Sequence, residues 1–210
     1  MVAIKNLSKK YGSHLVLQIP DLTIPSGTFW IEGGNGSGKT TFLKIIAGIC
    51  PFEGTVSVAN VDLKKSPVVY RKQVSYAEAE SQFPPTLTGT ELIQFFGQTR
   101  NADQARLEAL IDHFQVGNFL NQAVGGYSSG MIKKLSILLA FIGSPKLILL
   151  DEPLITLDVN FIPLLLSVIK KKQDEGISFL ITSHQAFEDN KFAFNGKLVV
   201  RDHCANLELK

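Results

Sequence analysis

The stretch Gly33–Thr41 (GGNGSGKTT) places four glycines in nine residues, between two apolar runs. Glycine loses more backbone entropy on folding than any other residue, so four together indicate a backbone path that other residues cannot follow. The spacing Gly33-x-x-x-x-Gly38-Lys39-Thr40 matches a phosphate-binding loop in full. GTFWIEG before the loop is typical of a strand, and TTFLKIIAGI after it has the period of a helix. The sequence therefore predicts a strand, a phosphate loop and a helix in succession.

This loop is expected to bind the phosphates of ATP together with Mg²⁺. Glycines let consecutive N–H groups turn inward around phosphate oxygens, and the start of the following helix adds a favourable dipole. We expect Lys39 to reach the β and γ phosphates and the Thr40 hydroxyl to bind Mg²⁺. A glycine-rich turn beside an unrelated lysine is the alternative. The predicted nucleotide-binding residues here are Gly33, Gly34, Asn35, Gly36, Ser37, Gly38, Lys39, Thr40 and Thr41.

A second segment, KLILLDEP (146–153), supplies carboxylates for the metal and for catalysis. Its four apolar residues indicate a buried strand, which places Asp151 at the strand's C-terminal end, where it can bind Mg²⁺ directly or through water. Glu152 is expected to accept a proton from the attacking water. The alternative is a carboxylate pair that merely begins a turn before Pro153.

The order of the patterns predicts an α/β fold. Short β-type runs extend from residue 1 to about 61, helical patterns occupy about 84–144, and a buried strand, a helix and another buried strand follow. We predict a P-loop NTPase core with a mixed or parallel sheet, an N-terminal antiparallel β part and an inserted helical subdomain. The chain would form one domain over 1–210, with a core lobe at about 1–82 and 146–210 and the helical subdomain at about 83–145.

Composition excludes several classes of protein. Hydrophobic residues make up 45% and charged residues 19% of the 210, which is not typical of disorder. The net charge of +2 comes from 21 basic and 19 acidic residues that are well mixed, so no nucleic-acid partner is expected. Two isolated cysteines indicate neither a disulfide framework nor a metal site. The N-terminus does not resemble a signal peptide, and the most apolar region (135–150) is interrupted before it reaches the ~20 residues that a membrane span needs.

Taken together, these motifs resemble the nucleotide-binding subunit of ATP-binding-cassette (ABC) transporters over nearly the whole chain. GGNGSGKTTFLKIIAGI and LILLDEPLITLD are similar to the family's phosphate and metal motifs, and YSSGM (127–131) stands where the family has its signature Leu-Ser-Gly-Gly-Gln. The resemblance implies that Ser128 and Gly130 cover ATP held by a second copy or a paralogue, in a head-to-tail dimer. Ser129 and Met131 depart from the usual signature, although the Ser-x-Gly-Met form resembles exporter-type members. Read alone, YSSG is equally compatible with a helix N-cap.

Three further residues take roles from the same resemblance. His184, after the strand SFLIT, would contact the γ-phosphate and order the attacking water, so Glu152, His184 and Lys39 form the expected catalytic set. Asp158 resembles the residue that joins the two subunits, and its alternative role is a helix N-cap. Tyr11 would stack on adenine, or else be an ordinary aromatic residue at a strand end.

The weakest match is the loop that should carry a glutamine toward Mg²⁺ and toward the membrane subunit. An ungapped placement puts Ala79 at that position, between Glu78 and Glu80, while Gln82 lies three residues later. Either a glutamate substitutes for the glutamine or Gln82 reaches back to the metal. The resemblance implies that this loop couples hydrolysis to transport, so the departure lies in the coupling element.

The resemblance implies an ATPase that dimerises on ATP and powers a separate membrane permease, more in the manner of an exporter than of an importer. Such a subunit would lie in the cytoplasm, held on the membrane by its permease. A soluble regulatory relative, or an interaction subunit that binds ATP without hydrolysing it, is the alternative. The cargo pathway belongs to the permease, so the sequence does not identify the transported substrate.

Overall fold

Residues 1–183 and 193–210 are described in the computed structural model of the chain. The N-terminal part forms a four-stranded antiparallel sheet with the strand order β2-β1-β4-β5. This is the antiparallel β part that the sequence predicts. Its strands are β1 (Val2–Tyr11), β2 (His14–Ile24), β4 (Glu53–Val58) and β5 (Val61–Asp62).

A second, six-stranded sheet forms the centre of the molecule, with the order β10-β9-β3-β8-β7-β6. Every neighbouring pair is parallel except β9 and β10, which form an antiparallel hairpin at one edge. The sheet is therefore mixed, as expected. Its strands are β3 (Thr28–Glu32), β6 (Val74–Ala77), β7 (Leu147–Leu150), β8 (Ser178–Thr182), β9 (Gly196–Arg201) and β10 (Cys204–Leu209).

Strand β7 and the centre of β8 (residues 179–181) are apolar without alternation because both faces of the central sheet are covered. Every residue of both strands is buried. Successive side chains point to opposite faces: Leu149 and Leu180 join the core on the side of the N-terminal sheet, whereas Ile148 and Ile181 join the core under the helices. A continuous apolar run is what a strand buried on both faces requires.

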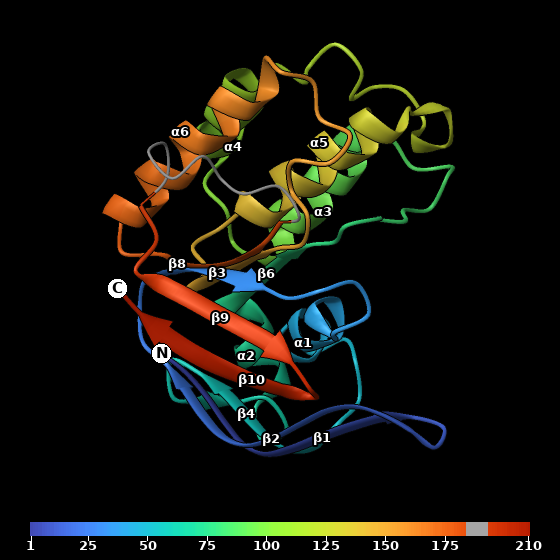
Figure 1. The fold of residues 1–210 in the computed structure, drawn as a ribbon. Helices are drawn as coiled ribbons and strands as arrows, with labels where there is room; N and C mark the ends of the chain where they lie inside the picture. The colour runs from blue at the N-terminus through green and yellow to red at the C-terminus, as the bar shows by residue number, and fades with distance from the viewer. Residues whose placement is uncertain (184–192) are drawn as a thin grey trace.

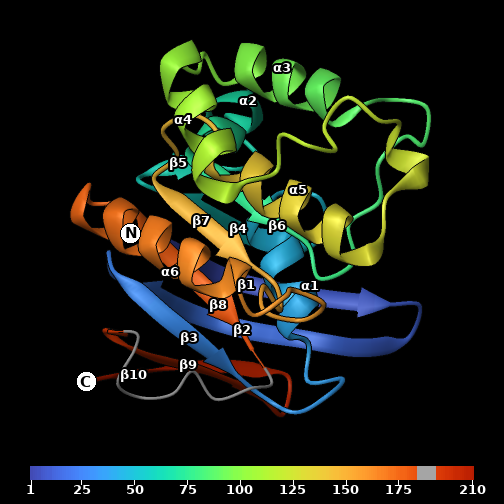
Figure 2. The same ribbon diagram turned by 90° about the horizontal axis from the view of Figure 1, so that it is seen from above.

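The helices divide between these two faces. Helices α1 and α2 lie with the N-terminal sheet on one side of the central sheet, and α3 to α6 lie on the other side (Figures 1 and 2). Three of the latter come from the stretch that the sequence assigns to helices. The helices are α1 (Lys39–Ile46), α2 (Pro67–Gln73), α3 (Gly89–Thr99), α4 (Gln104–Phe114), α5 (Ser129–Phe141) and α6 (Phe161–Asp174), with a 3₁₀ turn, η1, at Val124–Gly126.

Two segments depart from their local residue pattern. The segment before β6 is a helix, α2: Pro67 occupies its first turn and Tyr70 is fully buried, with its hydroxyl donating to the Ile46 carbonyl at 2.7 Å. Ile49, although apolar, lies beyond the end of α1 and is 55% exposed. In both cases packing and chain geometry override the local residue pattern.

The topology gathers the ends of four parallel strands at one edge of the central sheet. Strands β3, β8, β7 and β6 are neighbours in that order and run in the same direction. Their carboxyl ends therefore meet, and α/β folds bind ligands at such an edge. Within the described residues, no helix is long and apolar enough to cross a membrane.

Candidate nucleotide-binding site

The loop of residues 33–38 connects β3 to α1, in the order that the sequence predicts. Gly36 and Gly38 have φ of +75° and +101°, which other residues rarely adopt. A Cβ on Gly33 would lie 2.5 Å from the carbonyl oxygen of Val200, whereas the Cβ positions of Gly34 and Gly36 have no atom within 4 Å. The loop is thus tightly packed on its inner side and open on its outer side. No side chain caps helix α1, so the N–H groups of its first turn have no side-chain capping partner.

Lys39 folds its side chain back across this loop. Its ammonium donates to the carbonyl oxygens of Gly33 (2.8 Å) and Gly34 (3.1 Å), and the residue is 8% exposed. An ammonium has three donors, and these bonds use two. The positive charge is consequently held in place beside the open side of the loop.

The Ser37 hydroxyl lies on the packed inner side of the loop, where a Cβ on Gly33 would lie 2.5 Å from its Oγ. Its Oγ is buried, and it has no hydrogen-bond partner among the described residues. The open side of the loop instead presents the anchored Lys39 ammonium and an uncapped helix N-terminus. These groups fit an oxyanion such as a phosphate.

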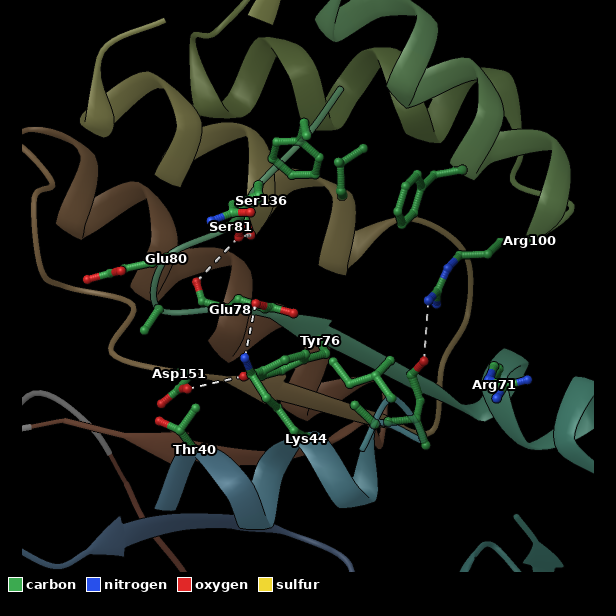
Figure 3. Close-up of a pocket in the computed structure, with 18 residues that line it drawn as sticks. Thr40, Lys44, Arg71, Tyr76, Glu78, Glu80, Ser81, Arg100, Ser136 and Asp151 are labelled. Atoms are coloured by element: carbon green, nitrogen blue, oxygen red, sulfur yellow. Dashed lines mark hydrogen bonds and ion pairs between the residues drawn. The ribbon is translucent and has the colours of Figure 1, made fainter. Parts of the chain in front are cut away.

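Asp151 lies at the carboxyl end of β7 and is 1% exposed. One carboxylate oxygen accepts a hydrogen bond from the Thr182 hydroxyl at 2.7 Å, and the other accepts one from the Tyr76 hydroxyl at 3.1 Å. Burial and the neighbouring Asp151 carboxylate raise the pKa of Tyr76, so this phenol stays protonated as a donor. Oxygen atoms of Asp151 and Thr40 line the same groove (Figure 3), and carboxylate and hydroxyl oxygens suit Mg²⁺.

Glu152 follows Asp151 with an unusual backbone conformation. Its φ is +47°, a left-handed value that is costly for a residue with a side chain. Its N–H donates to the Thr182 hydroxyl at 2.7 Å, and the residue is 7% exposed. The strained turn places Glu152 directly beside the predicted metal ligand.

A groove of about 990 Å³ opens beside these residues, between α1 and β6 on one side and α3 and α5 on the other (Figure 3). Thr40 and Asp151 lie at one end of it, and the loop after β6 forms one wall. Its polar and charged lining residues are Thr40, Lys44, Arg71, Tyr76, Glu78, Glu80, Ser81, Gln82, Arg100, Ser136 and Asp151.

Comparison with known proteins identifies this arrangement. The profile of the family described as "ABC transporter" matches residues 17–155, well over half of the chain. The ABC transporter ATP-binding protein NatA of Bacillus subtilis is 34% identical over 195 residues, which cover 88% of this chain and 79% of NatA. The chain belongs to the ABC transporter family.

Two other similarities have broader coverage. The lantibiotic transport ATP-binding protein SrtF of Streptococcus pyogenes is 29% identical, over 99% of this chain and 94% of SrtF. A solved structure of the ATP-binding cassette MJ0796, a dimer in a post-hydrolysis state bound to ADP and Pi, superposes with a TM-score of 0.84 at 21% identity, covering 100% of this chain and 98% of that one. The chain is an ATP-binding subunit of the transporter type, and its P-loop NTPase fold is confirmed.

The turn that resembles the family's signature, YSSGM (127–131), caps helix α5. Ser128 accepts a hydrogen bond at 3.3 Å from the backbone N–H of Met131, and a Cβ on Gly130 would lie 3.2 Å from the Thr156 carbonyl oxygen. The N-cap function that the sequence allows for Ser128 is therefore present. Ser128 and Ser129 are exposed, and among the described residues neither Ser128 nor Gly130 lines the groove with Thr40.

Asp158 lies just before α6, but the N-cap of that helix is Asn160, so the alternative role of Asp158 as the N-cap is not observed. Its carboxylate accepts from the backbone N–H of Phe161 at 3.0 Å and pairs with the Lys134 ammonium at 2.5 Å. The hydrogen bond with Lys134 is the main reason that the pKa of Asp158 is lowered. Lys134 belongs to α5, so the loop containing Asp158 is tied to the signature helix of the same chain.

Tyr11 lies at the end of β1 with 53% of its surface exposed. Its hydroxyl lies 3.5 Å from the Cys50 sulfur, and the Lys9 ammonium lies 4.3 Å from the ring centroid. The hydrogen bond with Cys50 and partial burial raise the pKa of Tyr11, while a hydrogen bond with the Thr41 side chain opposes them. The stacking of Tyr11 on adenine stays a prediction.

The loop after β6 lines the groove with all four residues that the sequence leaves open. Glu78 pairs with Lys44 of α1 at 3.5 Å, and Ala79 contributes a backbone carbonyl to a hydrogen bond. Gln82 and Glu80 are exposed in the groove wall. Which of them approaches the metal stays a prediction, and so does the placement of Gln82 as a ligand.

The expected switch residue, His184, lies outside the described residues, so its role also stays a prediction. The strand before it, β8, ends at Thr182 as the sequence indicates. Thr182 itself was not among the predicted site residues. A hydroxyl directly after the apolar residues Phe179 to Ile181 is the signal that could have found it.

Lys133 was missed as well, and no local pattern distinguishes it from the neighbouring Lys134. The structure buries Lys133 to 3% exposure, where its ammonium donates to three backbone carbonyls. Burial lowers the pKa of Lys133 to about 8, an effect that the carboxylates of Asp151 and Glu152 partly oppose.

Proposed function

We propose that the chain hydrolyses ATP with Mg²⁺, closes head to tail with a second copy or a paralogue over two nucleotides, and powers a separate membrane permease from the cytoplasmic side, in the direction of export. The observation that carries the hydrolysis proposal is the meeting of Lys39 and its open glycine loop with the buried Asp151 and Glu152 at one sheet edge. Catalysis would come from positioning and charge stabilisation.

Each residue then has a defined task. Lys39 and the N–H groups of the glycine loop bind the phosphates, while the oxygens of Thr40 and Asp151 hold Mg²⁺. The ion, when bound, neutralises charge on the phosphate oxygens. Glu152 takes the proton of the attacking water, and His184 aligns that water.

The head-to-tail dimer is supported by what surrounds the signature turn. Ser128 and Gly130 do not line the groove with Thr40, so within the described chain they have no nucleotide of their own to cover. The adjoining loop exposes Ile155 by 46% and Val159 by 79%, and apolar side chains exposed together favour an interface. The dimeric state of the similar cassette is consistent with this arrangement.

A permease would dock over the groove between α1 and α3. The loop of residues 78–82 forms a wall of that groove and lies on the same surface as Thr40 and Asp151, so a partner seated there would contact the site through one loop. The export direction rests on the Ser-x-Gly-Met form of the signature turn.

Steady-state ATPase assays of the purified chain and of Glu152→Gln test the hydrolysis proposal. We expect turnover to fall on the order of 10²-fold or more in the variant while Mg-ATP binding is retained, because only the proton acceptor is lost. Light scattering should show that Glu152→Gln forms a dimer with Mg-ATP. Glu175→Gln removes an exposed carboxylate of α6's C-terminal end and should hydrolyse ATP like the wild type.

The outcomes separate the alternatives. A wild-type chain that dimerises with ATP but never hydrolyses it would favour a non-hydrolysing interaction subunit. A Glu152→Gln chain that stays monomeric with Mg-ATP, even with its permease present, would contradict the head-to-tail dimer.

A further inference from the structure

We propose that Lys133 is a positioning residue that pins the Asp151–Glu152 peptide and the loop of residues 78–81 to helix α5, and thereby holds Glu152 in its working orientation. This inference rests on the proposed hydrolytic function, and it adds a residue to which neither the motifs nor the family comparison assigns a task.

Lys133 occupies a buried position on α5, where an apolar residue would be typical. Its neighbours on α5 from Leu135 to Phe141 are nearly all apolar and buried, yet Lys133 itself is only 3% exposed. Burial of a charge is costly unless it is well hydrogen-bonded. The three donors of the ammonium are all used, at 2.9 Å to the carbonyl oxygen of Asp151 and 3.1 Å to those of Glu78 and Ala79.

The first of these bonds fixes a strained peptide. The carbonyl of Asp151 and the N–H of Glu152 belong to the same peptide group, and that group is held at both ends: Lys133 binds its oxygen, and Thr182 accepts from its N–H at 2.7 Å. Glu152 has a φ of +47°, and a residue stays in this region only when its surroundings over-determine it. Lys133 and Thr182 together supply that constraint.

The other two bonds hold the groove wall next to the same peptide group. Glu78 and Ala79 belong to the loop after β6, and the Ser136 hydroxyl, one turn along α5, meets the Ser81 hydroxyl at 2.6 Å. One face of α5 therefore ties the loop at two points. Lys133 is the residue that joins this loop directly to Asp151, because a single ammonium binds both (Figure 3 shows the loop and Asp151 facing one another).

Helix α5 begins at the signature turn, so Lys133 links that turn to the Asp151–Glu152 peptide. Ser128 caps the helix, and Lys133 follows five residues later, about 7–8 Å along the axis. A shift of the signature turn on contact with a partner's nucleotide would reach the Asp151–Glu152 peptide through Lys133. The residue would thus connect the surface that meets the partner subunit to the proton acceptor of its own site.

Three substitutions test the proposal in the full chain. Lys133→Met keeps length and removes the donors, Lys133→Gln restores two N–H donors without charge, and Lys170→Met removes an exposed lysine of α6 as a control. We expect Lys133→Met to lower kcat on the order of 10²-fold, since a small misplacement of a reacting group has about that effect, with Kd for Mg-ATP changed less than about threefold. Lys133→Gln should recover about tenfold of the loss.

Hydrogen exchange on the unliganded proteins supplies a readout that does not depend on turnover. Peptides covering residues 78–83 and 150–154 should exchange faster in Lys133→Met than in the wild type or Lys170→Met. If the wild type lacks ATPase activity, the proposed function fails while the exchange result still decides the positioning claim.

Several results would overturn the inference. One is unchanged exchange of both segments in Lys133→Met. Another is a kcat within twofold of the wild type in Lys133→Met or, where that variant does not fold, in Lys133→Gln, for which a loss of about tenfold remains expected. The third is equal losses of binding and turnover in the Met and Gln variants, which would indicate a general packing role.

Discussion

Replacing Thr182 by valine should destabilise the fold far more than the small change in shape suggests. Thr182 is fully buried, and its hydroxyl both donates to Asp151 and accepts from the Glu152 N–H, each at 2.7 Å. Valine fills nearly the same volume but makes neither bond. Loss of a hydrogen bond to a buried carboxylate costs about 1.5–3 kcal/mol, and a buried N–H left without its acceptor costs about 1–3 kcal/mol. The structure therefore predicts a loss of about 3–5 kcal/mol.

Thr182→Ser is the matched control, because it keeps the hydroxyl and removes only one methyl group, at about 1 kcal/mol. For a chain of this length each kcal/mol lowers the Tm by about 2–4 °C, so valine should lower it by about 10 °C and serine by about 3 °C. Urea unfolding gives the free energies directly. If the valine and serine variants unfold within 1 kcal/mol of each other, the Thr182 hydroxyl does not hold Asp151 and Glu152, and the reasoning is refuted.

The parts of the fold that the sequence predicts are those in which local pattern and tertiary packing agree. Strand β7 is apolar throughout because both its faces are covered, and the glycine loop adopts backbone angles that only glycine tolerates easily. The helical insertion follows from residue periodicity. In each case the residues themselves carry the constraint, so no knowledge of distant contacts is needed.

The sequence is less informative where a distant contact decides. Pro20 lies inside β2, which is possible because β2 is an edge strand of its sheet and the pairing of β1 with β2 leaves out Pro20. Helix α2 contains Val68 and Val69, typical of strands, yet it forms over a buried Tyr70 that bonds to α1.

The candidate site divides in the same way. Lys39, Asp151 and Glu152 follow from motifs whose spacing fixes their geometry. Lys133 and Thr182 act on them through contacts 18 and 31 residues away along the chain, and one-dimensional spacing does not reveal such contacts.

Two further substitutions probe the rest of the site. Gly38→Ala should lower the free energy of unfolding by about 1–3 kcal/mol and weaken ATP binding, because Gly38 has φ of +101° and a Cβ there would lie 3.2 Å from Leu17. Gly126→Ala is the neutral control in the same urea and binding assays, because Gly126 lies at an open position without positive φ. Asp158→Asn should cost less than about 1 kcal/mol at pH 7, because the carboxylate paired with Lys134 is half exposed and solvent screens it. Since this pairing lowers the pKa of Asp158, the wild type's advantage should be complete above pH about 4, the ordinary value, and should vanish as the pH falls through the lowered pKa. Urea midpoints of the two proteins measured from pH 7 down to pH 3 test the sign: a difference that grows on acidification would mean that Lys134 does not stabilise the ionised carboxylate.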